Sequence, residues 1–317
     1  MELCLYHPRL GYYRRAGVRI GTAEGTDFFT AASSGSVFGE LVVAACVSLL
    51  AGRDPAEFEF LEIGAEPAES GPEARGVRRG VLEGVAHPFR SARAIGVAET
   101  LPEGGSVPAA APVRIEGPCV VFSNELFDAQ PFHRFVFRGG AWRELGVGFD
   151  GELPAERELP SATPAPLPPA APEGYRIDAP LHSVRLLEMI ASRSWTGLFV
   201  AFDYGKSWEE LSRGTPGGTA RAYYRHAQSA DLLARPGEQD LTCHVCWDWL
   251  ADALARHGFR SVQREFQEAF FLHHAEAWLE AAIKADSSSL SPRKRSLLQL
   301  LHPSHLGQKF QVLHALR

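Results

Sequence analysis

The chain has 317 residues, of which 45% are hydrophobic and 22% are charged, and its formal net charge at pH 7 is −6. This composition is typical of a globular protein with a substantial core, and the negative charge argues against a general affinity for nucleic acid or for an anionic membrane. Five cysteines do not indicate a disulfide framework, and no apolar stretch reaches the roughly 18 to 20 residues of a membrane-spanning helix. Because the N-terminus also lacks the pattern of a secretory signal, we expect a cytoplasmic protein.

The first part of the chain reads as an N-terminal helical or lid segment, residues 1–56. Within it, residues 26–31 predict a loop with two large apolar anchors, Phe28 and Phe29. Residues 37–50 carry apolar side chains at helical spacing, and the Asp54-Pro55 pair ends that pattern. We therefore place the main domain at residues 57–317.

Strand and helix patterns alternate through this main domain. The predicted strands are 58–63, 94–98, 113–115, 119–122, 198–202 and 311–313, and the predicted helices are 73–84, 181–191, 247–257, 270–283 and 292–301. This alternation indicates an α/β fold with a mainly parallel sheet.

Three segments interrupt the alternation. Residues 132–137 and 142–149 predict a hairpin appended to the sheet. The segment 153–172 is rich in Pro and Ala and predicts an extended surface connection, because proline lacks the N–H that a helix or a central strand uses. Residues 213–240 predict a long loop, and loops of such length are commonly lids or binding loops.

Polar residues follow the apolar strand 119–122 directly. Asn124 and Glu125 come next in the sequence, and Asp128 lies one helical turn past Asn124. Ligands of open α/β sheets bind outside the carboxyl ends of the strands, so these residues are candidates for a functional site. The structural alternative for Asp128 is that it stabilises the first turn of a helix through the helix dipole.

The strand 198–202 repeats this design, because Asp203 and Tyr204 follow it. Here the structural alternative is a turn that leads into a helix capped by Ser207. In the long loop, Arg221 could clamp a carboxylate and His226 could accept a proton near neutral pH, although loop residues of these types are also common as solvated side chains.

The tip of the first strand is a candidate ligand loop. It contains Glu62, Gly64 and Ala65, and a glycine there lets backbone N–H groups approach a ligand, although a plain strand-to-helix connection explains it equally well. Glu99 ends the second strand, where an acidic residue can accept both hydroxyls of a ribose, or can simply be exposed. The segment 243–246 is a lone CxxC pair without a second pair to complete a zinc site, so we expect no metal.

Taken together and in order, these segments resemble the MidA-like family of S-adenosylmethionine-dependent methyltransferases, relatives of the mitochondrial complex I assembly factor that methylates an arginine. The matching stretches are LYHPRLGYY (5–13), GTDFFTA (25–31), FGE (38–40), LEIGA (61–65), SNELFDAQPFHRF (123–135), FDYG (202–205), GTARAYYRH (218–226), DLTCHV (240–245) and LGQKFQVL (306–313). They span nearly the whole chain, and NELFDA and FDYG are the most specific.

The resemblance implies a Rossmann-like class I methyltransferase core, with a seven-stranded, mostly parallel sheet and with N-terminal and inserted helical segments. It implies S-adenosyl-L-methionine as cofactor and a protein as substrate, while the acceptor protein and the oligomeric state stay undetermined. The residues that it assigns fall into three groups: Glu62, Gly64, Ala65, Glu99, Phe29 and Thr30 for the cofactor; Asn124, Glu125 and Asp203 for catalysis; Asp128, Tyr204, Arg221 and His226 for the substrate.

The chain departs from the family pattern at the cofactor loop. The family has a glycine-rich GxGxG loop after the first strand, whereas this chain has GAEPAESG at 64–71 and keeps only the first glycine. Two functions therefore stay open at this point. One is an active methyltransferase that acts on a protein arginine, and the other is a methyltransferase fold that has lost catalysis and serves as a binding or assembly protein.

Overall fold

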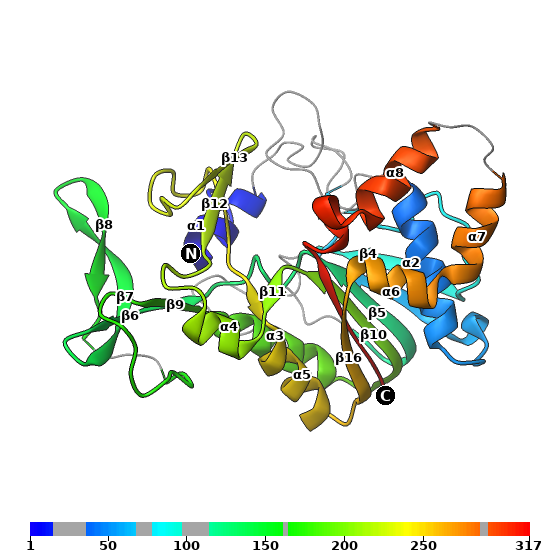
Figure 1. Cartoon of the computed structure of the whole chain (residues 1–317), viewed down its shortest axis with the longest axis horizontal. Coiled ribbons are helices and arrows are strands. Elements are labelled where there is room, and N and C mark those ends of the chain that lie inside the picture. The colour runs from blue at the N-terminus through cyan, green and yellow to red at the C-terminus, as the bar shows by residue number, and fades with distance from the viewer. Residues whose placement is uncertain (15–35, 68–77, 97–113, 161–163, 286–290) are drawn as a thin grey trace.

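The computed structural model describes residues 1–14, 36–67, 78–96, 114–160, 164–285 and 291–317. Its centre is a sheet in which the described residues form six strands, in the order β16-β17-β10-β5-β1-β4 (Figure 1). Their bounds are β1 Glu59–Ile63, β4 Ser91–Ile95, β5 Gly117–Asn124, β10 Trp195–Asp203, β16 Arg260–Phe266 and β17 Gln311–Leu316. Strands β4, β1, β5 and β10 run parallel, and β17 is antiparallel to both β10 and β16. The predicted α/β fold with a mainly parallel sheet is confirmed.

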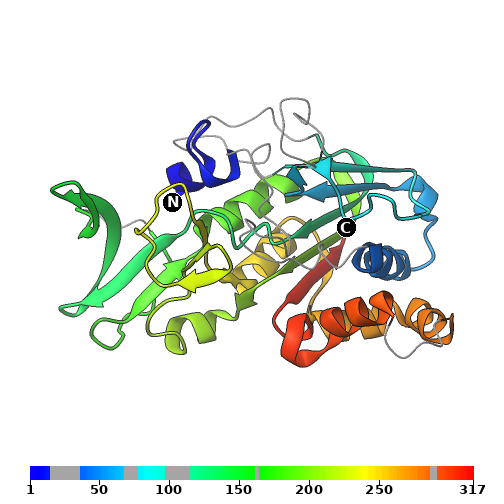
Figure 2. The same cartoon turned by 90° about the horizontal axis from the view of Figure 1, so that it is seen from above.

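Helices cover both faces of this sheet (Figure 2). On one face lie α3 (Leu181–Ala191) and α5 (Trp247–Arg256), and on the other lie α2 (Ser36–Leu49), α6 (Gln267–His274), α7 (Glu276–Ala285) and α8 (Pro292–Leu301). Side chains alternate along each strand, so Val121 and Phe199 join the core with α3 and α5, whereas Phe122 and Phe202 join the core with α2 and α6. Burial on both faces explains why the central strands are continuous apolar runs.

A second, antiparallel sheet lies at one end of the molecule (Figure 1), with the order β8-β7-β6-β9. Its strands are β6 (His133–Arg138), β7 (Ala141–Asp150), β8 (Leu153–Glu158) and β9 (Arg176–Ala179). The predicted hairpin is confirmed as β6 and β7. The prediction of an extended connection over 153–172 is wrong at its start, where residues 153–158 form β8. Proline is tolerated there because β8 is an edge strand, paired with β7 alone among the described residues.

The segment predicted as a long loop, 213–240, contains regular structure. Its strands β12 (Arg221–Tyr224) and β13 (Ala227–Ser229) form an antiparallel sheet with β14 (Asp240–Thr242), and this sheet lies beside α1 (Glu2–Tyr6) in Figure 1. The strands β11 (Gly205–Lys206) and β15 (Val245–Cys246), which flank this sheet in the chain, pair with each other. The helix α4 (Trp208–Arg213) follows β11, and Ser207 is its N-cap residue. Ser207 Oγ accepts a hydrogen bond from the Glu210 N–H at 3.2 Å, so the predicted capping role is confirmed.

Three other predictions of secondary structure differ from the structure. The predicted helix at 73–84 is wrong over its described part, where β3 (Arg78–Arg79) pairs with β2 (Glu66–Pro67) and a turn ends at Gly84, whose φ is +70°. The described residues 114 and 115 of the predicted third strand are irregular. The predicted helix 270–283 is two helices, α6 and α7, which Ala275 separates with a non-helical φ of −124°.

Among the described residues, no helix is both long enough and apolar enough to cross a bilayer. The predicted cytoplasmic location stays a prediction.

Candidate functional site

The carboxyl end of β5 has an unusual backbone conformation. Glu125 has a φ of +52°, in the left-handed region that non-glycine residues rarely occupy, and its N–H donates to the Phe202 carbonyl at 2.9 Å. Asn124 Nδ2 donates to Glu125 Oε1 at 3.0 Å, while Asn124 Oδ1 and Ser123 Oγ are buried without a hydrogen-bond partner in the described part of the chain. Strained backbone and unpaired buried polar atoms cluster at functional sites, so this strand end is the leading candidate.

Asp203, at the end of β10, holds the loop that follows β5. Its side chain is fully buried, and its Oδ2 accepts hydrogen bonds from the backbone N–H groups of Phe127 at 2.8 Å and Asp128 at 3.3 Å. Its Oδ1 accepts from the N–H of Tyr204 at 2.9 Å. Oδ2 of Asp203 therefore positions the backbone at Phe127 and Asp128, while Oδ1 fixes the backbone at the end of β10.

Four carboxyl groups gather at this edge of the sheet, and we call Glu125, Asp128, Asp203 and Asp240 the acidic cluster. Burial raises the pKa of Asp128 well above its usual range, and the negative charges of Asp203, Glu125 and Asp240 raise it further. Burial likewise raises the pKa of Asp203, against the effect of its backbone donors. The raised pKa values favour the neutral forms of Asp128 and Asp203. A cation bound beside them would offset the like charges and favour their ionised forms.

The N-terminal segment and the neighbouring elements fix the loop after β5 in place. Tyr6 OH donates to the Ala129 carbonyl and Ser183 Oγ donates to the Phe127 carbonyl, each at 2.7 Å. Tyr13 OH donates to Asp240 Oδ1 at 2.8 Å. Residues of α1, α3 and β10 thus hold the loop after β5, and Tyr13 ties the N-terminal segment to β14. Contacts from several elements are how a rigid binding geometry is obtained.

The tip of β1 contacts this loop. Gly64 has a φ of +96°, and a Cβ added there would lie 3.0 Å from Leu126 Cδ1, so only glycine fits without strain. The N–H groups of Gly64 and Ala65 donate to the Ile95 carbonyl at 2.9 and 2.8 Å. Glu62 Oε2 accepts from the Val81 N–H at 2.5 Å, and burial raises the pKa of this carboxyl to about 7.

The remaining predicted residues fall in different places. Tyr204 lies beside the acidic cluster, where its ring packs on Phe310 with centroids 4.1 Å apart and where burial, with the charges of Glu125 and Asp128, raises its pKa. Arg221 lies on β12, and its side chain donates to the Ala220 carbonyl at 2.6 Å. His226 is exposed in the turn between β12 and β13 with a φ of +62°. The predicted residues Phe29, Thr30 and Glu99 lie outside the described part of the chain.

The sequence alone did not identify Tyr13, Tyr223 and Asp240 as part of this site. Tyr223 pairs with Asp240 across β12 and β14, and the charges of Asp128 and Asp240 help to raise its pKa. The signal in the sequence was that all three residues fall within matching stretches: Tyr13 in LYHPRLGYY, Tyr223 in GTARAYYRH and Asp240 in DLTCHV. Neither tyrosine follows a strand of the central sheet, so the strand-end rule did not select them.

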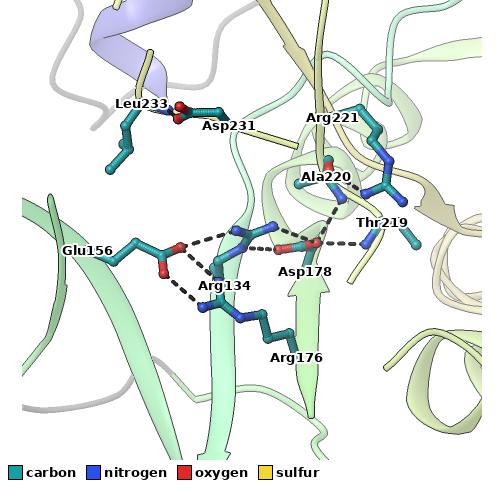
Figure 3. A network of polar contacts seen from close by, with 9 residues as sticks. All are labelled: Arg134, Glu156, Arg176, Asp178, Thr219, Ala220, Arg221, Asp231 and Leu233. Atoms are coloured by element: carbon teal, nitrogen blue, oxygen red, sulfur yellow. Dashed lines mark hydrogen bonds and ion pairs between the residues drawn. The ribbon is translucent and has the colours of Figure 1, made fainter. Parts of the chain in front are cut away.

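An ion-pair network on the second sheet holds the residues that precede β12 (Figure 3). Asp178, on β9, accepts from Arg134 Nε at 2.7 Å and from the backbone N–H groups of Thr219 and Ala220, each at 2.8 Å. Glu156, on β8, accepts from Arg134 Nη1 at 3.2 Å. The second sheet is therefore tied through buried Asp178 to the residues that precede β12, which fixes the position of Tyr223.

The sequence and the fold of this chain are similar to those of known and proposed methyltransferases. The model of a family described as "Putative S-adenosyl-L-methionine-dependent methyltransferase" matches residues 106–264, half of the chain. A zebrafish (Danio rerio) protein named "Protein arginine methyltransferase NDUFAF7, mitochondrial" is 25% identical over 209 residues, 62% of this chain and 47% of that protein. The chain thus spans about half the length of the curated relative that it matches.

Two solved structures from Burkholderia thailandensis are similar to this one. The first, described as a "likely methyl transferase" bound to S-adenosyl-homocysteine, has a TM-score of 0.81 and 23% identity, and the match covers 100% of this chain and 86% of that chain. The second, a native structure of an uncharacterized protein, has a TM-score of 0.77 and 24% identity, with 100% and 85% covered. These likenesses show the fold and confirm the predicted Rossmann-like core.

Proposed function

This chain belongs to the family of putative S-adenosyl-L-methionine-dependent methyltransferases, and from that membership we propose that it methylates an arginine side chain of a protein. The observation that carries the proposal is the acidic cluster. A guanidinium group placed beside Glu125 and Asp128 would offset the like charges that raise the pKa of Asp128 and would form charge-assisted hydrogen bonds with these two carboxylates. The zebrafish relative, an arginine methyltransferase by name, supports the same substrate class.

The residues at the strand ends fit the cofactor of the family. S-adenosyl-L-methionine carries a sulfonium cation and an α-ammonium group, and the buried oxygens of Ser123 and Asn124, unpartnered among the described residues, lie at this edge as acceptors. Gly64 has no Cβ, so the tip of β1 can approach Leu126 of the loop after β5 closely. We assign the cofactor to Glu62, Gly64, Ala65, Ser123 and Asn124, with Phe29, Thr30 and Glu99 as further predicted contacts.

When bound, S-adenosyl-L-methionine would supply the methyl group, and its sulfur would keep the electron pair of the broken carbon–sulfur bond. The acceptor guanidinium would lose one N–H proton, to the Glu125 carboxylate or to solvent. Glu125 accepts N–H bonds from the guanidinium and orients it, so that the lone pair of the reacting nitrogen faces the methyl group. Asn124 holds Glu125 through their hydrogen bond of 3.0 Å. Asp203 acts as a positioning residue through the backbone of Phe127 and Asp128. Orientation and preorganised charge are the main sources of rate enhancement in this scheme.

Two measurements test the proposal. Calorimetric titration with S-adenosyl-homocysteine, which binds without turnover, is expected to give one site with a dissociation constant in the micromolar range, about −8 kcal/mol. Transfer of labelled methyl groups to arginine-containing and lysine-containing proteins then identifies the acceptor residue. We expect label on arginine only. Label on lysine would overturn the arginine assignment, and no binding by folded protein would favour a binding or assembly role.

The Glu125→Gln variant separates catalysis from cofactor binding. We expect it to lose about 10²-fold or more in turnover, as enzymes do when one preorganised charge is removed, while its affinity for S-adenosyl-homocysteine stays within a few-fold of the native protein. The matched control is Glu188→Gln, which removes an exposed carboxylate of α3 that pairs with Arg256. Unchanged turnover in Glu125→Gln would remove Glu125 from the mechanism.

A further inference from the structure

Three histidines surround one carboxylate at the edge of the central sheet. Glu265 lies on β16, His273 and His274 lie on α6, and His314 lies on β17. None of these elements contributes a residue to the acidic cluster. The sequence did not predict this site, because the four residues come from three separate segments without a ligand motif.

The imidazole nitrogens converge on the two carboxylate oxygens. His273 Nδ1 lies 2.5 Å from Glu265 Oε2, and His274 Nε2 lies 2.8 Å from Glu265 Oε1. One ligand atom from each of Glu265, His273 and His274 lies within 4.8 Å of the other two. On the buried side, His314 Nε2 lies 3.0 Å from Glu265 Oε1.

We propose that Glu265, His273 and His274 bind a divalent first-row transition-metal ion such as Zn²⁺. Two imidazoles and one carboxylate are a common donor set for zinc, which binds nitrogen and oxygen at about 2.0–2.2 Å and leaves its ligand atoms about 3.3 Å apart in a tetrahedral site. The present contacts, 2.5 and 2.8 Å, are shorter than that separation by about 0.8 and 0.5 Å, so the imidazoles would have to move outward to admit the ion. His273 has a side chain that is 64% exposed, so it has room to move outward and admit the ion.

His314 would orient the Glu265 carboxylate of this metal site through a hydrogen bond. Its side chain is only 5% exposed, and it contacts the carboxylate from inside the protein. Metal ligands are commonly held in orientation by such hydrogen bonds from a second layer of residues. His314 therefore fixes the Glu265 carboxylate from the buried side while the two histidines of α6 approach from the outer side.

The consequence of the site is structural. An ion there would tie α6 to β16, and through His314 to β17. Phe310, the residue just before β17, packs on Tyr204 beside the acidic cluster. A metal ion that binds only the folded chain stabilises it in proportion to the logarithm of the ion concentration. The proposed ion therefore holds this edge of the sheet together.

The test uses the full chain, stripped with a chelator and titrated with Zn²⁺ alone by calorimetry, with the unfolding temperature measured in parallel. We expect one equivalent of Zn²⁺ to bind and to raise the unfolding temperature by several degrees. In His273→Gln/His274→Gln, we expect the affinity to fall at least tenfold and the thermal shift to disappear. Because His273 is exposed, the single variant His273→Gln is expected to fold and to show a weakened affinity even if the double variant does not fold.

The control variant is His305→Gln, which removes an imidazole that lies 5.3 Å, between ring centroids, from that of His302. It is expected to bind Zn²⁺ as the native protein does. Titration with Co²⁺ adds a spectroscopic readout, in which nitrogen and oxygen ligands give visible bands without a sulfur-to-cobalt charge-transfer band. Equal affinity in His273→Gln, the absence of stoichiometric binding by the native protein, or a charge-transfer band from a cysteine ligand would each overturn the proposal.

Discussion

The carboxylate of Asp203 accepts a hydrogen bond from the backbone N–H of Phe127 at 2.8 Å, so the end of β10 holds the loop that follows β5. The two strands are neighbours in the sheet, and Phe202 pairs with Asn124 in their register. The strained residue Glu125 lies between these two points of attachment. The backbone of Glu125 is therefore held on its N-terminal side by the pairing of Asn124 with Phe202, and on its C-terminal side by the hydrogen bond from Phe127 to Asp203.

Removal of the Asp203 side chain is expected to loosen this loop. In Asp203→Ala, the buried N–H groups of Phe127 and Asp128 lose their acceptor, and we expect a loss of about 2–4 kcal/mol in the free energy of unfolding. Asp203→Asn keeps one acceptor oxygen and should cost less than Asp203→Ala. The control is Asp231→Ala, at an exposed carboxylate that accepts from Leu233 N, with an expected cost below about 1 kcal/mol. Equal losses at Asp203 and Asp231, measured by urea unfolding, would contradict this account.

A side chain at Gly64 is expected to be destabilising because of its positive φ and because of its contact with Leu126. Gly84 has a positive φ without a close neighbour, so it shows the effect of the backbone alone. Gly64→Ala forces alanine into a φ of +96° and brings its Cβ against Leu126, whereas Gly84→Ala meets a φ of +70° with no atom within 4 Å. We expect about 1–2 kcal/mol of destabilisation from backbone strain in both variants. Gly64→Ala should lose more stability than Gly84→Ala, and only Gly64→Ala should bind S-adenosyl-homocysteine more weakly. Calorimetry that shows the same affinity for both variants would remove Gly64 from the cofactor site.

Arg134 is expected to be far more important than its neighbour Arg138 on the same strand. Arg134→Met leaves Asp178, whose side chain is fully buried, without its main counter-charge, and we expect a loss of about 3–5 kcal/mol. Arg138→Met breaks an exposed pair with Glu158 and should cost no more than about 1 kcal/mol. Similar losses in the two variants, measured by chemical unfolding, would show that the network in Figure 3 does not hold the second sheet in place.

The buried carboxyl of Glu62 predicts a pH dependence of stability. Its pKa is raised from 4.5 to about 7, so between these values the folded chain binds more protons than the unfolded chain does. Stability from this group is therefore fully present below about pH 4.5 and is lost as the pH rises through about 7. The Glu62→Gln variant cannot titrate there and keeps an acceptor for the Val81 N–H.

The stability of Glu62→Gln relative to the native protein should accordingly increase from pH 5 to pH 8, by at most about 1.4 kcal/mol for each pH unit. His182 and His244 have pKa values lowered to about 4 by burial, which gives the opposite slope between about pH 4 and 6.5. Both histidines are present in the two proteins, so their effect cancels in the difference. Unfolding curves that stay parallel at all pH values would show that Glu62 titrates normally.

Local pattern was sufficient to predict much of the central fold. The apolar runs of β1, β5 and β10 are long enough to need burial on both faces, and that need alone implies a parallel sheet between helices. Because the carboxyl ends of parallel strands share one edge, the strand pattern also predicts that Asn124, Glu125 and Asp203 lie near one another. Ser207 was identifiable as a cap since its partner, Glu210, lies three residues away.

Other features depend on contacts between distant segments, which a single sequence does not encode in its local pattern. β8 forms because β7 offers an unpaired edge, although residues 153–158 begin a proline-rich stretch. Tyr13 reaches Asp240 across 227 positions of sequence, and His314 reaches Glu265 across 49. The sequence by itself determined which strands are buried and which residues stand at their ends, because burial and strand direction follow from short-range composition. Only the tertiary structure decided which tyrosines and histidines join them, because pairing over such separations depends on how the whole chain packs.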